Sequence, residues 1–504
     1  MSVEITDCNI IGNELIGIRI SSTNPTVVRN CIIRGNSSIR EGGGLYCSGP
    51  AEIDNCVISG NSSIGEGGGI YCSGHTEINN CIISDNIAAK NGGGVYLESH
   101  NFKGQSRVVN CEITGNTSAG HGGAACIYGY TEVLNCKISG NVAWDDGGGI
   151  LGLDVFIEQC RVMGNTAGGV GGGLCVGGFT TIVHSYISGN SARAGGGVYM
   201  YVMNGEVSDS VIAGNIGRSY CGGFYASSKI GCGFLVNCTV AQNRGGPQSP
   251  VAGIMSYDVD ISNCIVWGNE TFGPWPPVQI GGGYFNNVHY VHYTCVEGGW
   301  QGVGNIEEEP IFVAPGYWDA NGTAGDMNDD FWVDGDYRLR GDSPCIDAGD
   351  LNFIAGPNET DIDGNPRVID GDEDGIARVD MGAFEYVPSI EAQVRIMPKV
   401  LNLRSNGNWI MCTIKLPPPC KIEEIDTNSV LLNERIRAEK VWVGEYRDVA
   451  IATFNRKAVE EILHPGEVEL LVTGRLNEGQ EFEGSDTIRV ISGPKGPGNR
   501  GGKK

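Results

Sequence analysis

The residues best suited to binding a metal ion lie in one aspartate-rich stretch. The sequence DGDEDG spaces Asp370, Asp372 and Asp374 by two and ends in glycine, like the first half of an EF-hand loop. Met381 stands where that loop would place its last carboxylate, so Asp380 or a backbone carbonyl would complete a calcium shell. The alternative interpretation is a solvated, Asp-rich turn. Other acidic residues that could join the site are Asp361, Asp363, Asp326, Asp329, Asp330, Asp334 and Asp336.

A second set of chemically capable residues precedes a repeated glycine triplet. If these residues stack, like-charged neighbours would raise a carboxyl pKa or recruit a cation. Hydrolysis of a glycoside needs clustered carboxyl groups, and proton abstraction from a sugar acid needs a base such as Arg or Lys. The alternative is a solvated polar corner, and no motif marks a base, so binding is expected ahead of catalysis. The stacked positions are Glu41, Glu66, Asn91, His121, Asp146, Val170 and Ala194. The catalytic candidates are Glu66, His121, Asp145, Asp146 and Arg161, with Lys137 and Arg193 nearby in the repeat.

Tyrosines recur just after the triplets and could contact sugar rings. Stacked aromatic side chains can lie against sugars, although in a sheet they also stack on one another. The tyrosines are Tyr46, Tyr71, Tyr96, Tyr199 and Tyr225.

The segment HYVHYTC imitates a zinc motif through His289, His292 and Cys295. On a strand, His289 and His292 would point to opposite faces, because side chains alternate. The segment therefore favours a β-strand over a zinc site.

All these residues belong to a chain that repeats one short motif. DNCVISGN, NNCIISDN, VNCEITGN and LNCKISGN each combine an apolar alternation with a closing Asn, and a glycine triplet follows. The alternation predicts short strands with one buried face, and a period near 25 residues predicts the coils of a parallel β-solenoid. Leucine-rich repeats share this period but need an L-x-x-L-x-L frame that the chain lacks. The repeated Cys positions are Cys8, Cys31, Cys56, Cys81, Cys111, Cys136, Cys160, Ser185, Ser210, Cys238 and Cys264.

Stacking of coils predicts that equivalent residues form columns along the axis. Coils about 4.8 Å apart would place Cys and Ile inward, where small apolar thiols pack well. Ser185 and Ser210 fit the same slot, which indicates a structural role rather than a redox role. The repeated Asn would serve a left-handed turn or a stacked amide ladder, and the glycine triplets would permit positive φ. The Asn positions are Asn13, Asn36, Asn61, Asn86, Asn116, Asn141, Asn165, Asn190, Asn215, Asn243 and Asn269.

Composition restricts the class of partner. The 504 residues include 80 Gly and carry a formal charge of −25, which argues against nucleic acid and anionic membranes and is compatible with divalent cations. No apolar run reaches transmembrane length. The N-terminus lacks a signal segment and starts inside a strand, so we expect the natural protein to begin further upstream. Of 19 Cys, Cys412 and Cys420 are the candidate disulfide pair.

Two resemblances follow from these motifs. GNSSIGEGGGIYCSG and GNSARAGGGVYMYV resemble the unit of right-handed parallel β-helix proteins with a pectin-lyase-like fold, and they are similar to repeats of chlamydial polymorphic outer-membrane proteins. The likeness spans about residues 1–285 and implies a right-handed coil; in such enzymes a solenoid face holds calcium and sugar acids. YTCVEGGWQGVGNIEEEPIF, SPCIDAGD and DIDGNPRVIDGDEDGIARVDMGAFEY resemble the choice-of-anchor Q domain, which implies secretion to the cell surface.

The sequence therefore predicts an all-β chain. We expect a parallel β-helix over 1–288, an irregular Asp/Gly-rich cap region over 289–388, a β-sandwich over 393–492 and a flexible basic tail over 493–504. NRKAVEEILHPG is the one helical candidate. The leading hypothesis is an extracellular or cell-surface protein that binds glycans, with calcium stiffening the cap region. The alternatives are a lyase or hydrolase of acidic polysaccharide, and a spacer or filament subunit that makes end-to-end contact at its open N-terminal coil.

Overall fold

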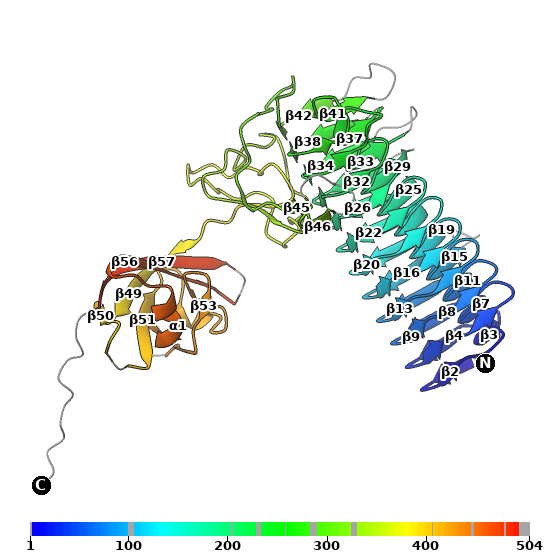
Figure 1. Ribbon diagram of the computed structural model, residues 1–504, viewed down its shortest axis with the longest axis horizontal. Coiled ribbons are helices and arrows are strands. Elements are labelled where there is room, and N and C mark those ends of the chain that lie inside the picture. The colour runs from blue at the N-terminus through cyan, green and yellow to red at the C-terminus, as the bar shows by residue number, and fades with distance from the viewer. Residues whose placement is uncertain are drawn as a thin grey trace, which may run out of the picture. The chain divides into compact units, whose positions relative to one another are not determined.

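The computed structural model forms two compact units, Met1–Tyr386 and Val387–Lys504, each described by itself (Figure 1). The described residues are 3–98, 105–202, 205–227, 233–257, 259–282, 290–323, 330–405, 407–444, 448–477 and 480–492. The predicted basic tail and the candidates His289, Asp326 and Asp329 lie outside them. In the described part of the chain no helix is long and apolar enough to cross a membrane.

The first unit is built on a parallel β-helix, which confirms the predicted fold class. One coil contributes β7 (Leu45–Ser48), β8 (Ala51–Asp54), β9 (Val57–Ser59) and β10 (Ser62–Ser63). These pair in parallel with β11 (Ile70–Ser73), β12 (Thr76–Asn79), β13 (Ile82–Ser84) and β14 (Ile87–Ala88) of the next coil. Repetition of this pairing gives three parallel sheets, here called A (two strands per coil), B and C (Figure 1).

Sheet B is the sheet against which the residues that follow the β-helix pack. Its 12 strands follow one another along the axis in chain order. They are β2 (Asn9–Ile11), β5 (Ile32–Arg34), β9, β13, β17 (Glu112–Thr114), β20 (Lys137–Ser139), β23 (Arg161–Met163), β27 (Tyr186–Ser188), β31 (Val211–Ala213), β35 (Thr239–Ala241), β39 (Ile265–Trp267) and β43 (Cys295–Val296).

The corners of each coil use left-handed residues at fixed places. Between sheets A and B the residue before the Cys is left-handed, as at Asn55 (φ 50°), a conformation that Asn tolerates. Between sheets B and C the left-handed residue is a glycine in most coils, as at Gly60 (φ 61°), and Asp85 (φ 55°) takes its place in one of the others. The repeated Asn61 that follows is buried and serves as a rung of an amide ladder, so the ladder interpretation of these Asn residues is the right one.

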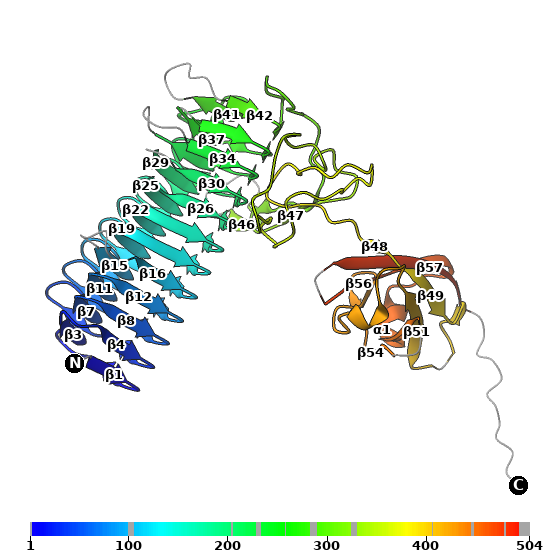
Figure 2. The ribbon, with the colours of Figure 1, turned by 180° about the vertical axis from the view of Figure 1, so that it is seen from behind.

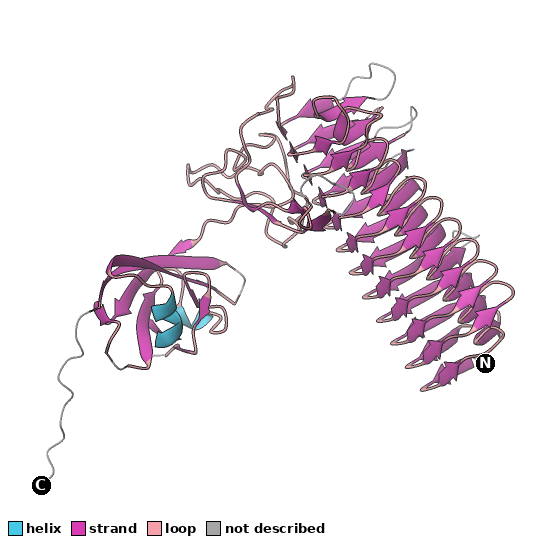
Figure 3. Ribbon diagram, in the orientation of Figure 1, coloured by secondary structure: helices cyan, strands magenta, loops and turns pink. Residues whose placement is uncertain are grey.

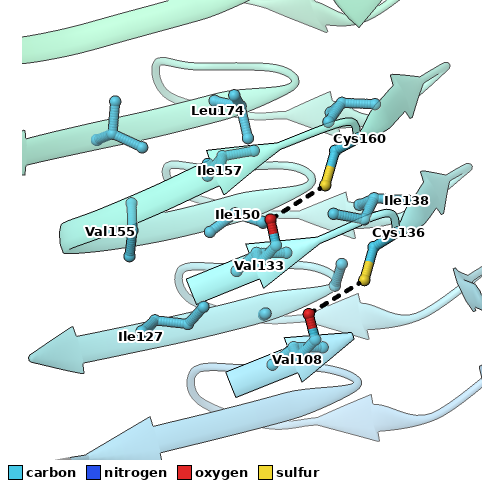
Figure 4. Packing of buried hydrophobic residues seen from close by; sticks show 14 of the residues in the cluster. Val108, Ile127, Val133, Cys136, Ile138, Ile150, Val155, Ile157, Cys160 and Leu174 are labelled. Carbon is cyan, nitrogen blue, oxygen red and sulfur yellow. Dashed lines mark hydrogen bonds between the residues drawn. The ribbon is translucent and has the colours of Figure 1, made fainter. Parts of the chain in front are cut away.

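The bore of the β-helix is filled by columns of aliphatic side chains and thiols (Figure 4). Cys136 and Cys160 each donate to a carbonyl of a preceding coil, of Val108 and Val133, both at 3.4 Å. Ser185 occupies the same slot, since the backbone N–H of Cys160 donates to its hydroxyl at 3.2 Å. The repeated Cys is therefore a structural residue packed in register, as the repeat predicts.

Residues 307–323 and 330–386, here called the cover, pack along one side of the β-helix (Figure 2). Their short strands form two antiparallel pairs: β44 (Phe312–Ala314) with β47 (Asp336–Leu339), and β45 (Tyr317–Asp319) with β46 (Phe331–Val333). Met381, Ala383 and Phe384 share one apolar cluster with Val211 and Ile265, which point outward from sheet B. The predicted cap region thus covers a side of the last coils, while Trp300 packs against the core of the β-helix.

The second unit has two sheets around one apolar core (Figure 3). One sheet is β49 (Gln393–Met397), β51 (Trp409–Lys415), β55 (Ala450–Asn455) and β54 (Lys440–Trp442). The other comprises β48 (Ile390–Glu391), β57 (Glu481–Ile491), β56 (Gly466–Arg475), β52 (Leu431–Leu432) and β53 (Ile436–Arg437), with β50 (Val400–Asn402) beside β57.

Helix in the described residues is confined to this unit, as η1 (Ile422–Glu424) and α1 (Arg456–Glu461). The prediction of a helix in NRKAVEEILHPG is confirmed, and the Asn455 side chain caps it by accepting from Lys457 and Ala458. Cys412 and Cys420 pack in the same core, but both are free thiols in the structure, which differs from the predicted disulfide pair.

Candidate functional site

The repeated tyrosines lie on the outer surface of sheet A, on the strand that follows each glycine triplet. This surface, here called the tyrosine face, is carried by β7, β11, β15 (Val95–Glu98), β19 (Ala125–Leu134), β22 (Ile150–Glu158), β25 (Leu174–Gly178), β29 (Val198–Val202) and β33 (Phe224–Ala226). Strand register aligns one column: Tyr46, Tyr71, Tyr96, Cys126, Leu151, Cys175, Tyr199 and Tyr225. The five predicted tyrosines therefore share a column but fall into two groups.

The tyrosine rings stack on one another. Centroids of Tyr46 and Tyr71 are 5.2 Å apart, those of Tyr71 and Tyr96 are 5.3 Å apart, and both pairs are parallel within 4°. The Arg19 guanidinium lies 5.1 Å from the centroid of Tyr46. Ring faces that a sugar would contact are thus used inside the column, which leaves edges and hydroxyls for a ligand.

Carboxylates flank this column. The Tyr71 hydroxyl donates to Glu98 Oε2 at 3.3 Å. Burial raises the pKa of Tyr71, and the nearby Glu98 carboxylate raises it further. The hydroxyl therefore stays protonated and is held as a donor.

Four bulky side chains are exposed where the first strand of sheet A turns into the second, and one of them, Tyr201, also packs edge-on against Tyr199 with ring centroids 4.9 Å apart. Tyr130, Leu153, Phe179 and Tyr201, here called the exposed ridge, come from successive coils and are 43%, 40%, 66% and 44% exposed. Gly177 lies in register between Leu153 and Tyr201. Its missing side chain leaves room for Leu153, because a Cβ at Gly177 would lie 3.1 Å from Leu153 Cδ2. The sequence analysis missed this ridge, although aromatic residues beside glycine in YGYT and GGFT could have signalled it.

The corner between sheets C and A carries the acidic column expected before the glycine triplets. Lys90 Nζ lies 3.5 Å from Glu66 Oε1, a partner that the sequence analysis did not name. His121 Nδ1 lies 3.5 Å from Asp146 Oδ2 and accepts the backbone N–H of Asp146 at 3.2 Å. Asp146 Oδ1 in turn accepts the N–H of Val170 at 2.9 Å. These polar side chains link neighbouring coils.

The five catalytic candidates do not converge on one point. Glu66 lies two coils before His121 in the column, with Asn91 between them. Asp145 is exposed beside Asp146. Arg161 belongs to β23 of sheet B, on another side of the coil, where its guanidinium lies 5.4 Å from the ring centroid of Tyr186. The arrangement can bind a polar ligand at the corner, but it brings no basic residue of sheet B to it.

Three carboxylates of the cover form a possible cation site. Ligand atoms of Asp347, Asp370 and Asp372 all lie within 4.8 Å of one another. Asp347 accepts from the backbone N–H of Gly371 and Asp372 at 2.8 and 2.9 Å, which holds it against the loop. Asp370 Oδ1 is buried and has no hydrogen-bond partner. Two of the predicted aspartates thus come together with Asp347, which lies 23 residues earlier and outside the loop motif.

The other predicted acidic residues within the described part of the chain have protein partners. Asp374 faces Arg378 at 3.5 Å, and Asp363 pairs with Arg338 at 2.6 Å. Asp361 and Asp380 are buried and accept several backbone N–H groups, which makes them structural. Further pairs are Asp330 with Arg244, Asp334 with Trp332 and Asp336 with Arg338.

His292 and Cys295 lie on opposite sides of a corner formed by left-handed Tyr293. His292 Nδ1 lies 3.4 Å from Asp260 Oδ1, while Cys295 is buried under the cover. The expected strand is present as β42 (Tyr290–His292).

The comparison with protein-family models agrees with the fold. A family model described as a right handed beta helix region matches residues 1–141. No curated protein matches the chain. A solved structure, the crystal structure of pectate lyase Pel9A, is similar with 13% identity and a TM-score of 0.39, over 72% of this chain and 88% of that one. The family match and the observed strand register together show that the first unit contains a right-handed parallel β-helix.

Proposed function

We propose that this chain is an extracellular or cell-surface protein that binds polysaccharide along the tyrosine face and its exposed ridge. The observation that carries the proposal is the ridge, because Tyr130, Phe179 and Tyr201 expose ring surface at steps of the coil repeat. Exposed aromatic rings offer apolar area to the C–H faces of sugars at little entropic cost. The column of hydroxyls and carboxylates beside the ridge supplies hydrogen-bond partners for sugar hydroxyl groups.

Affinity electrophoresis tests this proposal directly. Mobility would be measured in gels that contain polygalacturonate, alginate, xylan or chitosan. Retardation by at least one polymer is expected, and Phe179→Ala with Tyr130→Ala should weaken it about tenfold, equivalent to about 1.4 kcal/mol. Phe234→Ala is the matched control, because Phe234 is 43% exposed but lies on the second strand of sheet A, outside the ridge. Absence of retardation by all four polymers, or equal losses in ridge and control variants, would reject the proposal.

One observation favours catalysis as a second candidate. The His121 imidazole and the Asp146 carboxylate, 3.5 Å apart at the acidic corner, have the composition of an acid–base pair. A lyase would release unsaturated uronate products, which absorb in the ultraviolet, and a hydrolase would release reducing ends. Activity that is lost in both His121→Ala and Asp146→Asn would move this candidate ahead of simple binding.

We also propose calcium as the ligand of Asp347, Asp370 and Asp372. Three carboxylates offer the hard oxygen donors that Ca²⁺ prefers. The buried, unpartnered Asp370 Oδ1 supports this choice, because a buried anionic oxygen without a partner is costly unless a cation compensates it. The bound ion would stiffen the loop that joins these residues, and it takes no part in glycan binding.

A further inference from the structure

Cys295, the last Cys of the β-helix, lies one residue beyond the position of the inward thiol column. Cys264 Sγ donates to Ser262 O at 3.1 Å, and in the next coil Thr294 Oγ1 donates to His292 O at 3.0 Å in the same way. The N–H of Cys264 donates to Thr294 Oγ1 at 3.4 Å, so Thr294 occupies the column slot. Cys295 follows one residue later, in register with outward-facing Ile265. Because side chains alternate along a strand, its thiol points out of the bore.

The outward thiol of Cys295 faces the cover, where it meets Cys345. Both residues are completely buried, and both belong to the apolar cluster between sheet B and the cover. The Cys295 thiol is the largest cause of a pKa for Cys345 well above its ordinary value, with burial second. Cys345 is fixed by two backbone bonds: its N–H donates to Ser343 Oγ at 3.2 Å, and its carbonyl accepts from Met381 at 3.0 Å. The Cys295 thiol itself donates to the Glu308 carbonyl of the cover at 3.2 Å. Both residues are free thiols in the structure, and they lie in one buried cluster although they come from separate segments.

The stacked thiols of the bore are arranged differently. Cys56 and Cys81 are parallel neighbours, and the N–H of Cys56 donates to the thiol of Cys81 at 3.4 Å. In-register residues of a parallel pair follow the strand spacing of about 4.8 Å, whereas a disulfide holds its two Cβ atoms at roughly 3.5–4.5 Å. A bridge inside the column would pull two coils together, while Cys295 and Cys345 approach from two elements.

We propose that Cys295 and Cys345 form an intrachain disulfide that fastens the cover to the last coil. Both S–H bonds break and one S–S bond forms, and two electrons and two protons pass to a low-molecular-weight disulfide such as oxidised glutathione, which becomes two thiols. The reaction proceeds by thiolate attack through a mixed disulfide. Since both thiols are buried, the bond forms while the cover is still open during folding, and afterwards the cover shields it from reductants.

Peptide mapping of the full chain tests the bond. The protein would be refolded in a glutathione redox buffer, alkylated under denaturing conditions and digested without reduction. One cross-linked species joining the Cys295 and Cys345 peptides is expected, together with two fewer alkylated thiols than in the reduced chain. Both peptides recovered fully alkylated, or Cys295 joined to any other Cys, would overturn the proposal.

Thermal unfolding gives a second readout. Reduction should lower the Tm of the oxidised chain by roughly 5 °C, because a cross-link of this loop length restricts the unfolded chain. Cys345→Ser should have a Tm that does not respond to the reductant. Cys136→Ser, within the inward column, is the matched control and should respond as the natural chain does. A natural chain whose Tm is unchanged by reduction would count against the bond.

Discussion

Arg367 of the cover donates its Nε–H to Asp209 of the β-helix at 2.8 Å, in a pair of which neither side chain is more than 5% exposed. The guanidinium also donates to Glu385 at 2.8 Å and to the carbonyls of Gly382 and Asn237 at 2.8 and 3.2 Å. These bonds join segments 158 residues apart and satisfy a fully buried cation. The contact is therefore a principal anchor of the cover.

Replacing Arg367 with Met should strongly destabilise the first unit. Asp209 would remain buried without its cation, and Glu385 would lose the hydrogen bond from Arg367, which together cost about 3–5 kcal/mol. Urea unfolding, followed by circular dichroism, measures this loss. Glu112→Gln removes the exposed Lys137–Glu112 pair, 2.7 Å apart, and should cost less than about 1 kcal/mol. Similar losses in both variants would contradict the anchor role.

Stability of the first unit should fall as the pH rises from 5 to 9. Burial, with a contribution from Asp380, raises the pKa of Glu385 to about 9, and burial raises the pKa of Asp380 to about 7. Arg367, Asp209, Asp361 and Asp347 are the charged groups around them. A raised carboxyl pKa means that the folded state holds protons that the unfolded state releases near pH 4. The stabilisation is therefore complete at low pH and is lost through pH 7 and 9, by at most about 1.4 kcal/mol per pH unit for each proton.

Thermal unfolding over that pH range provides the check. Glu385→Gln keeps an acceptor for Arg367 but cannot ionise, so its Tm should depend less on pH than that of the natural chain. Parallel Tm curves for the two proteins would show that Glu385 does not titrate in this window.

A second, exposed ladder of side-chain amides runs along the corner between sheets A and B, where Asn135 donates to Asn110 at 2.8 Å. Substitutions in the buried ladder should destabilise the first unit far more than substitutions in this exposed one. Asn141 Oδ1 accepts both the N–H and the side-chain amide of Asn116, at 2.9 and 3.0 Å, and both donors are buried. Asn141→Ala leaves the buried N–H of Asn116 without a partner, at roughly 1–3 kcal/mol, while the Asn116 amide keeps its bond to the Ile83 carbonyl at 2.9 Å. Asn110 lies in the exposed ladder at φ 55°, so Asn110→Gly keeps the backbone conformation and should cost less than about 1 kcal/mol. Comparison of their urea midpoints tests the difference.

The cost of a substitution in the thiol column should depend on the size of the new side chain. Cys136→Ser keeps a donor for the Leu134 carbonyl, as Ser185 does for Val183, and should change the free energy of unfolding by about 1 kcal/mol or less. Cys136→Leu adds atoms to a filled bore and should cost roughly 1–3 kcal/mol. A larger loss for Ser than for Leu would point to a specific role for sulfur.

Calcium should raise the Tm of the natural chain, and a chelator should reverse the rise. Asp372→Asn removes one carboxylate charge from the proposed site and should abolish the calcium response. Asp374→Asn is the control, because Asp374 lies in the same loop but faces Arg378 rather than the three-carboxylate group. A calcium response that depends on Asp374 instead would favour the EF-hand-like set over the group containing Asp347.

Periodic features of this fold can be predicted from sequence, and contacts between non-periodic segments cannot. The columns, the inner Asn ladder and the short helix after Asn455 follow from local pattern and from one repeat length. The repeat could also have shown that Arg161 lies away from the acidic corner. Arg161 follows Cys160 as Lys137 follows Cys136, and both residues therefore belong to sheet B. The path of the cover depends instead on single contacts such as Arg367 with Asp209, and on Asp347 joining a loop 23 residues away. No repeat signals these contacts.

Equivalence of the coils makes the length of the β-helix adjustable in whole units. Asn55 and Asn80 occupy the same corner of successive coils, and Cys56 and Cys81 begin the same strand. Excision of residues 56–80 would join Asn55 to Cys81 with every remaining side chain above an equivalent neighbour. Unequal recombination within the gene can therefore shorten or extend the β-helix by one whole coil at a time, and the corners of the remaining coils need no change in sequence.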